Sequence, residues 1–281
     1  MKWQNLRRSS NVEDRRGMGR PTAVAGGGLT IVAIIVMLIL GKDPGELLQS
    51  IQPGAQDGSG MVQTSPEDNL TADMCSAILA STEDVWGQIF TSSGLTYKAP
   101  SLVLFTGAVE SACGLAQSAS GPFYCSGDRK VYLDISFFND LASRFGASGD
   151  FAQAYVIAHE VGHHVQNLLG TLDKVHEEMA AASKTAANKL SVRLELQADF
   201  YAGLWAHFAD EATALLEKGD LEEALNAASQ IGDDRIQKRS QGYVVPDAFT
   251  HGTSAQRLKW FKKGFESGDP ELANEILTGA L

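Results

Sequence analysis

His159-Glu160-Val161-Gly162-His163 is the most informative stretch of this 281-residue sequence. In an α-helix, positions i and i+4 lie on the same face, so His159 and His163 can each direct a ring nitrogen at one metal ion. Glu160 lies beside them, where its carboxylate can act on a metal-bound water. The spacing is typical of zinc-dependent peptide hydrolysis. The alternative is an amphipathic helix whose histidines are ordinary core or surface groups.

The residues around this motif predict a helix over residues 151–169. Ser148-Gly149-Asp150 supplies capping residues before the segment, no proline interrupts it, and a glycine follows it. Gly162 costs about 1 kcal/mol of helix propensity relative to alanine, so we expect it to serve close packing beneath the metal. His164 lies about 100° around the helix from its neighbour and is expected at the surface or behind the site.

A catalytic zinc ion needs a third protein ligand and keeps its fourth position for water. A second apolar helical run covers residues 191–208 and carries Glu195 and Asp199 at positions i and i+4. One of these carboxylates could bind zinc while the other accepts a hydrogen bond from a ligand histidine. We favour Glu195 as the third ligand, and the alternative is that both are solvated helix charges. The competing ligands are His176, His207 and His251.

Other stretches, spread over residues 65–268, match the sequence pattern of a known family. They are Ser111-Ala112-Cys113-Gly114, Gly121-Pro122-Phe123-Tyr124-Cys125, Val131-Tyr132-Leu133-Asp134, Arg144-Phe145-Gly146, Ala158 to Gln166, Arg193 to Asp199, Ile231-Gly232-Asp233-Asp234 and Phe249 to Arg257. The chain thereby resembles the bacterial putative neutral zinc metallopeptidases of the YpfJ type. The resemblance implies an HExxH zincin of the gluzincin type, in which Glu195 binds zinc and Asp199 supports it from outside the coordination sphere. In zincins of this class an edge strand over the active-site helix can pair with a peptide substrate, and we expect residues 131–133 near that edge.

The predicted mechanism follows from these side chains. One zinc ion per chain, bound by His159, His163 and Glu195, would lower the pKa of its water toward neutrality. Glu160 would take the proton as the water attacks the peptide carbonyl, and would then return it to the leaving amine. The expected activity is that of a zinc metallopeptidase, an endopeptidase acting on a protein or peptide substrate.

The group that stabilises the oxyanion is not determined by the motif. His251 and Arg257 are candidates because they lie where a loop opens a helix and presents hydrogen-bond donors, and Tyr243 is a third. We expect His251 to be a second catalytic residue, although it could instead approach the zinc ion as an exchangeable ligand. The competing interpretation is that Thr253 or Ser254 only caps a helix while Arg257 forms a salt bridge.

The N-terminal part differs in composition from the rest of the chain. Residues 1–22 hold six basic and two acidic side chains, a net charge of +4, so the remaining residues carry −15 for a total of −11. Residues 23–41 form an apolar segment just long enough to span a bilayer, with a cleaved signal peptide or a buried helix as alternatives. Residues 42–65 indicate a flexible linker, and residues 66–281 are long enough for a single catalytic domain.

This charge distribution predicts a location and excludes one class of partner. Basic residues beside a membrane helix stay on the cytoplasmic side. We therefore expect a single-pass protein of the bacterial inner membrane, anchored through residues 23–41, with a basic cytoplasmic N-terminus and a periplasmic or extracytoplasmic catalytic domain. The acidic domain argues against nucleic acid as a partner.

The three cysteines fit an oxidising compartment. Cys113 and Cys125 flank a short Gly- and Ser-rich loop and could form a disulfide, which in the chain-entropy model would contribute about 3 kcal/mol. The alternative is two independent buried thiols. Cys75 is expected to be a buried small hydrophobic residue in the first helix.

The expected fold class is α+β and predominantly helical: a zincin-like metallopeptidase domain with a small β-sheet, preceded by one N-terminal transmembrane helix. Further helices are predicted over residues 65–90, 170–190, 221–239 and 254–265, and short strands over residues 102–106 and 131–134. Three functions remain open: a membrane-anchored endopeptidase, a zinc amidase acting on cell-wall peptides, and a catalytically inactive zincin-fold binding protein. The complete set of zinc-site residues disfavours the third.

Overall fold

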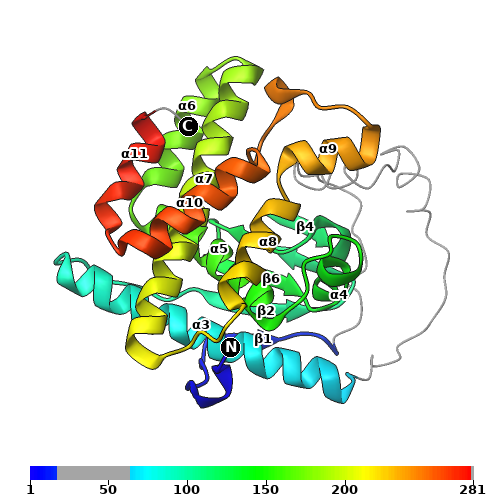
Figure 1. Cartoon of the computed structure of the whole chain (residues 1–281), viewed down its shortest axis with the longest axis vertical. Coiled ribbons are helices and arrows are strands. Elements are labelled where there is room, and N and C mark those ends of the chain that lie inside the picture. Colours follow the sequence, from blue (N-terminus) through cyan, green and yellow to red (C-terminus); the bar gives the residue numbers. More distant parts are fainter. Residues whose placement is uncertain (18–63, 280–281) are drawn as a thin grey trace.

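A mixed four-stranded sheet lies at the centre of the computed structural model, which describes residues 1–17 and 64–279 (Figure 1). In spatial order its strands are β1 (Val12–Asp14), β2 (Ser101–Phe105), β6 (Lys130–Asp134) and β5 (Phe123–Cys125). β1, β2 and β6 are parallel, and β5 is antiparallel to β6. A separate antiparallel hairpin consists of β3 (Ala108–Ser111) and β4 (Gly114–Gln117).

Side chains alternate along each strand, so successive residues point to opposite faces of the sheet. Different elements cover these two faces. Leu102, Leu104 and Val131 point into the large core formed with the helices. Val103 and Tyr132 point the other way and pack in a smaller cluster with the β3–β4 hairpin. The helices that carry the catalytic candidates therefore all belong to the first face.

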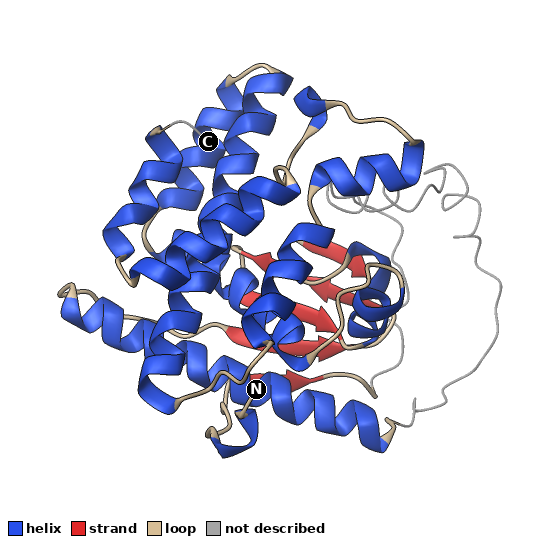
Figure 2. Cartoon of the chain, viewed as in Figure 1, coloured by secondary structure: helices blue, strands red, loops and turns tan. Residues whose placement is uncertain are grey.

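Helices make up most of the described chain, as Figure 2 shows. They are α3 (Pro66–Ser92), α4 (Ser136–Ser143), α5 (Asp150–Leu168), α6 (Thr171–Ala181), α7 (Lys184–Thr213), α8 (Asp220–Gln230), α9 (Asp233–Gln241), α10 (Ser254–Ser267) and α11 (Ala273–Thr278), with short 3-10 helices η1 (Trp3–Asn5), η2 (Ser118–Ser120), η3 (Pro246–Ala248) and η4 (Pro270–Leu272). α5 packs against β5, β6, α7 and α8, and α10 lies along α7. The predicted α+β, predominantly helical fold class is confirmed.

Two predicted helices are each divided in the structure. The segment 170–190 is shared between α6 and α7, because the hydroxyl of Ser183 caps a new helix by accepting a backbone N–H of its first turn at 3.4 Å. The segment 221–239 is shared between α8 and α9. They separate at Gly232, where an added Cβ would lie 2.4 Å from the backbone nitrogen of Ser254.

The basic N-terminal segment is part of this fold. β1 forms the edge of the sheet next to β2. The guanidinium groups of Arg7 and Arg8 form ion pairs with Asp84 and Asp73 of α3, at 2.7 and 2.6 Å. The predicted division between a separate basic tail and a catalytic domain is therefore wrong for residues 1–17, because the domain supplies both the strand partner and the acidic partners of that segment.

This arrangement bears on the predicted membrane topology. The predicted anchor, residues 23–41, and nearly all of the predicted linker, residues 42–65, lie outside the described residues. Within residues 1–17 and 64–279, no helix is both long and apolar enough to cross a membrane. A single crossing between residues 17 and 64 would require β1 to leave its pairing with β2. The membrane location rests on the apolar segment alone and stays a prediction.

We expect residues 1–17 and 64–279 to lie on the same side of any membrane. Single Ser10→Cys and Ser93→Cys variants place a thiol at an exposed position before and after the undescribed segment, whereas Cys75 is buried and the other two cysteines are paired. A membrane-impermeant maleimide should label both variants in intact cells, or neither before lysis. Labelling of one variant alone would contradict the pairing of β1 with β2 in the cell.

The strand available to a substrate differs from the one expected. Residues 131–133 belong to β6, which lies between β2 and β5, and β5 pairs with its residues 130–132. The expectation that these residues lie near the edge is therefore wrong, and β5 is the edge strand on this side. A disulfide joins Cys125 of β5 to Cys113 in the β3–β4 turn, and Cys75 is buried in α3.

Candidate metal centre

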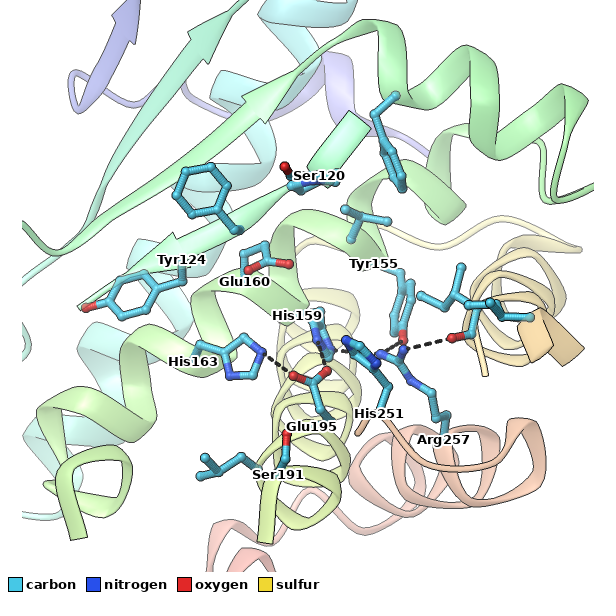
Figure 3. Close-up of a pocket in the computed structure, with 18 of the residues that line it drawn as sticks. Ser120, Tyr124, Tyr155, His159, Glu160, His163, Ser191, Glu195, His251 and Arg257 are labelled. Carbon is cyan, nitrogen blue, oxygen red and sulfur yellow. Dashed lines mark hydrogen bonds and ion pairs between the residues drawn. The ribbon is translucent and has the colours of Figure 1, made fainter. Parts of the chain in front are cut away.

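Three side chains that the sequence suggested as zinc ligands meet in the structure. The ring Nε2 of His159 lies 3.3 Å from one carboxylate oxygen of Glu195, and Nε2 of His163 lies 3.5 Å from the other. α5 supplies both histidines from one face, and α7 supplies the glutamate from the neighbouring helix (Figure 3). Two helices thus direct three potential ligand atoms at one point.

Each of these separations is close to the distance between neighbouring ligands of a zinc ion. Zinc binds imidazole nitrogen and carboxylate oxygen at about 2.0–2.1 Å, which places two ligands of a tetrahedron about 3.3–3.4 Å apart. Two imidazoles and one carboxylate also leave a fourth position open, as catalytic zinc sites do. The residues present therefore suit zinc in both chemistry and spacing.

The close approach of α5 and α7 depends on a glycine within the motif. A Cβ added at Gly162 would lie 3.0 Å from the backbone of Ala198 on α7. This glycine therefore allows the histidine-bearing turn to reach the helix that carries Glu195. The structure shows the close packing that we expected from the low helix propensity of glycine.

A buried carboxylate orients the first histidine. Asp199 lies one turn beyond Glu195, and its Oδ1 accepts hydrogen bonds from Nδ1 of His159 at 2.8 Å and from the Tyr155 hydroxyl at 2.5 Å. A bond at Nδ1 leaves Nε2 of the ring for a metal. Burial alone lowers the pKa of His159, but the charge and the hydrogen bond of Asp199 raise it to about 10. Metal binding at this ring must therefore release a proton.

A glutamine orients the second histidine, a role that the sequence interpretation missed. Oε1 of Gln166 accepts a hydrogen bond from Nδ1 of His163 at 2.9 Å, and its amide nitrogen donates to the Leu194 carbonyl at 2.7 Å. Both ends of the amide are used, so its orientation is fixed. The i+3 spacing from His163 on the same helix face was the signal that could have identified this residue.

Glu160 lies in the same cleft as the potential ligands. The residue is buried, and burial raises the pKa of its carboxyl above the usual value, against the opposing effect of His163 and His159. A raised pKa favours the protonated form, which a carboxyl that carries a proton between two transfer steps needs. Figure 3 shows Glu160 on the α5 turn between the two histidines.

His251 reaches the site from the loop before α10. The backbone N–H groups of Thr250, His251 and Gly252 donate to Oδ2 of Asp233 at 2.8, 2.6 and 2.9 Å, and Nδ1 of the His251 ring lies 3.3 Å from Oδ1. Burial lowers the pKa of His251, but the charges of Glu195 and Asp233 outweigh it and raise the pKa overall. Asp233 is a second residue whose role the sequence interpretation missed.

The remaining candidates take other places. The guanidinium of Arg257 forms a buried salt bridge with Asp199, as in the competing sequence interpretation. Tyr243 is 62% exposed and lies outside the residues that line the cleft. Nδ1 of His207 donates to a backbone carbonyl of α10, and His176 lines the cleft without joining the three ligand atoms.

His164 supports the wall of the cleft. It is fully buried, its Nε2 donates to the Lys98 carbonyl at 2.6 Å, and its Nδ1 accepts the Tyr124 hydroxyl at 3.0 Å. Burial lowers the pKa of His164 to about 4, so the ring is neutral and can accept at Nδ1. We predicted His164 either at the surface or behind the site, and the structure confirms the second place.

The potential ligands lie in a cleft of about 770 Å³ with β5 in its wall. Two groups of apolar side chains line this cleft. Val156, one turn before the first histidine, packs in the main core with Phe145 and Ile231. Leu172 and Leu194 belong to a separate apolar cluster beyond the second histidine.

Comparison with known proteins agrees with this arrangement. The family described as putative neutral zinc metallopeptidase matches residues 1–276. The chain belongs to this family. Uncharacterized protein YpfJ of Escherichia coli strain K12 is 50% identical over 283 residues, covering 98% of each chain. Uncharacterized protein Mb2605 of Mycobacterium bovis is 44% identical over 195 residues, 66% of this chain and 65% of that protein.

The family match begins at residue 1, so it includes the residues that form β1. This extent agrees with the place of residues 1–17 in the sheet. No solved structure matches the chain.

Proposed function

We propose that this family member is a zinc-dependent endopeptidase whose metal ion is held by His159, His163 and Glu195. The observation that carries the proposal is the spacing of 3.3 and 3.5 Å between the two carboxylate oxygens and the two Nε2 atoms. The proposal is also supported by the hydrogen bonds at Nδ1 of both histidine rings and by the fourth coordination position that the three ligands leave open. A binding protein without activity would not need this combination beside Glu160.

Zinc bound at this site supplies a Lewis acid and lowers the pKa of a water molecule toward neutrality. Glu160 acts as the general base: its carboxylate takes the proton from the attacking water. The same carboxyl then delivers the proton to the leaving amine nitrogen. Its buried position and raised pKa favour holding the proton between these two transfers.

His251 is the best-placed group to stabilise the negative charge on the carbonyl oxygen. Asp233 engages its Nδ1 and the backbone around it, which leaves Nε2 as the donor for a substrate. A fixed N–H donor directed at a developing oxyanion is an effective form of catalysis.

The cleft suits an extended peptide with apolar side chains. β5 is an edge strand that lines the cleft, so its free backbone groups can pair with a substrate strand. Val156 lies on α5 one turn before His159, whereas Leu172 of α6 and Leu194 of α7 form a second apolar group in the cleft. We therefore propose peptides with bulky apolar residues on both sides of the cleaved bond as the preferred substrates.

Glu160→Gln tests this function because it keeps the shape of the side chain and removes the base. Wild type and variant should each bind close to one equivalent of zinc, and the variant should lose casein cleavage by about 100- to 10,000-fold, the usual range for a general base. Glu178→Gln, at an exposed position on α6, is the control and should keep full activity.

The outcomes separate the alternatives. Release of peptides from peptidoglycan in place of casein cleavage would assign the amidase. Equal activity of Glu160→Gln and wild type would exclude Glu160 as the base. Wild-type protein that binds no zinc would exclude the metal site.

A further inference from the structure

Arg257 makes the densest set of buried polar contacts around the zinc-binding cluster. Its Nε donates to Oδ2 of Asp199 at 2.8 Å and its Nη2 donates to Oδ1 at 3.0 Å, so the pair is bidentate. Nη2 also lies 3.2 Å from the Tyr155 hydroxyl and 3.4 Å from Nδ1 of His159. Arg257 is 2% exposed and Asp199 is completely buried. Every oxygen of this carboxylate is therefore held by a fixed donor.

The position of this arginine is unfavourable for its own helix. Arg257 is the fourth residue of α10, and a cation in the first turn of a helix opposes the helix dipole. Thr253 and Gln256 already form a complete capping box there, so helix formation does not require a charge. The contacts with Asp199 compensate for this cost, which indicates that the arginine serves the site rather than α10.

A second contact links Arg257 to the other half of the site. Its Nη1 donates to the Ile231 carbonyl at 3.4 Å. Ile231 lines the cleft, and two residues later Asp233 holds His251 and its loop. Figure 3 shows the guanidinium between the His159 side and the chain segment to which it donates.

We propose that Arg257 is a positioning residue that fixes Asp199 as the acceptor for His159, and so sets the strength of zinc binding. The residue is 2% exposed and its guanidinium is engaged by the protein, so in this proposal it acts through Asp199. Without the bidentate salt bridge from Arg257, the Asp199 carboxylate could rotate away from Nδ1 of His159. The His159 ring would then lose its fixed orientation. The hydrogen bond from Arg257 to the Ile231 carbonyl also positions the loop that carries His251 relative to the Asp199 carboxylate.

Arg257→Lys tests the proposal, since lysine keeps the positive charge but cannot form a bidentate contact. The zinc dissociation constant is measured by competition with a chelator, together with kcat and KM on a peptide and the melting temperature of the zinc-free protein. We expect zinc binding to weaken about 10- to 100-fold, as on losing other partners of ligand histidines. The zinc-free protein should stay folded. Lys262→Met, which removes an exposed charge from the same helix, should bind zinc as wild type does.

A double-mutant cycle with Asp199→Asn shows whether the effect passes through this carboxylate. The two substitutions should be non-additive in zinc affinity, because each disrupts the same contact. Wild-type zinc affinity in folded Arg257→Lys, or strict additivity in the cycle, would overturn the proposal. If Arg257→Lys does not fold, Asp199→Asn alone must still weaken zinc binding, and wild-type affinity there would overturn it as well.

The proposal rests on the zinc site of the proposed function, and the measurements keep the two apart. Absence of zinc from the wild type would refute the proposed function. Strong zinc binding in the wild type together with an unaffected Arg257→Lys would refute only the role of Arg257.

Discussion

Glu195→Ala should abolish zinc binding and peptidase activity together. The substitution removes the only carboxylate among the three ligand atoms that meet in the described chain, and two imidazoles alone do not complete a catalytic zinc site. Removal of a residue that only hydrogen-bonds to a metal ligand lowers metal affinity about 10- to 100-fold. For a direct ligand we therefore expect a loss in zinc affinity above about 100-fold. Metal content after dialysis and the rate of peptide cleavage measure the two effects.

A control on the same helix separates metal loss from general damage. Glu211→Ala removes an exposed glutamate near the end of α7, where surface substitutions change stability by less than about 0.5 kcal/mol. It should retain zinc and activity. A Glu195→Ala protein that still binds one equivalent of zinc with wild-type affinity would show that Glu195 is not a ligand.

Gly203→Ala should destabilise the fold strongly. A Cβ at Gly203 on α7 would lie 2.0 Å from the carbonyl oxygen of Phe261 on α10, which is backbone and cannot rotate away. Overpacking costs about 1–3 kcal/mol, and we expect about 3 kcal/mol here. For a chain of this size that corresponds to a fall in melting temperature of about 6–12 °C. Displacement of α10 should also weaken zinc binding, because α10 carries Arg257.

Gly87→Ala in α3 is the matched control. It is also a helical glycine, but no atom lies within 4 Å of an added Cβ. Alanine should therefore stabilise α3 by up to about 1 kcal/mol through its better helix propensity. A melting temperature of Gly203→Ala at or above that of wild type would contradict the close contact between α7 and α10.

The sequence alone identified the residues that meet at the candidate metal centre because their spacing is local. His159, Glu160 and His163 share one helical turn, and Glu195 and Asp199 share another. Helical periodicity places each set on one face whatever the rest of the fold does. The same local reasoning failed at Ser183 and Gly232, where a cap and a close contact divide predicted helices.

Contacts between distant segments could not be inferred in this way. Arg257 was one of three oxyanion candidates, and only the packing of α10 on α7 places it on Asp199. Asp233 lies 18 residues before His251, and no periodicity relates the two. The edge strand was also misplaced, since the order of strands in a sheet depends on pairing rather than on sequence pattern.

The N-terminal segment shows most clearly what could not be inferred from the sequence. Its basic charge and the apolar segment that follows it suggested a tail separate from the domain. Composition gives the charge of a segment but does not identify the acidic side chains that pair with it. In the structure, acidic side chains of α3 pair with the basic side chains, and β2 pairs with β1. The sequence by itself predicted the ligand set of the proposed zinc site, which needs only residues on helical turns. The tertiary structure decided which residues hold that chemistry in place, because those contacts exist only once α5, α7, α10 and the N-terminal strand have packed together.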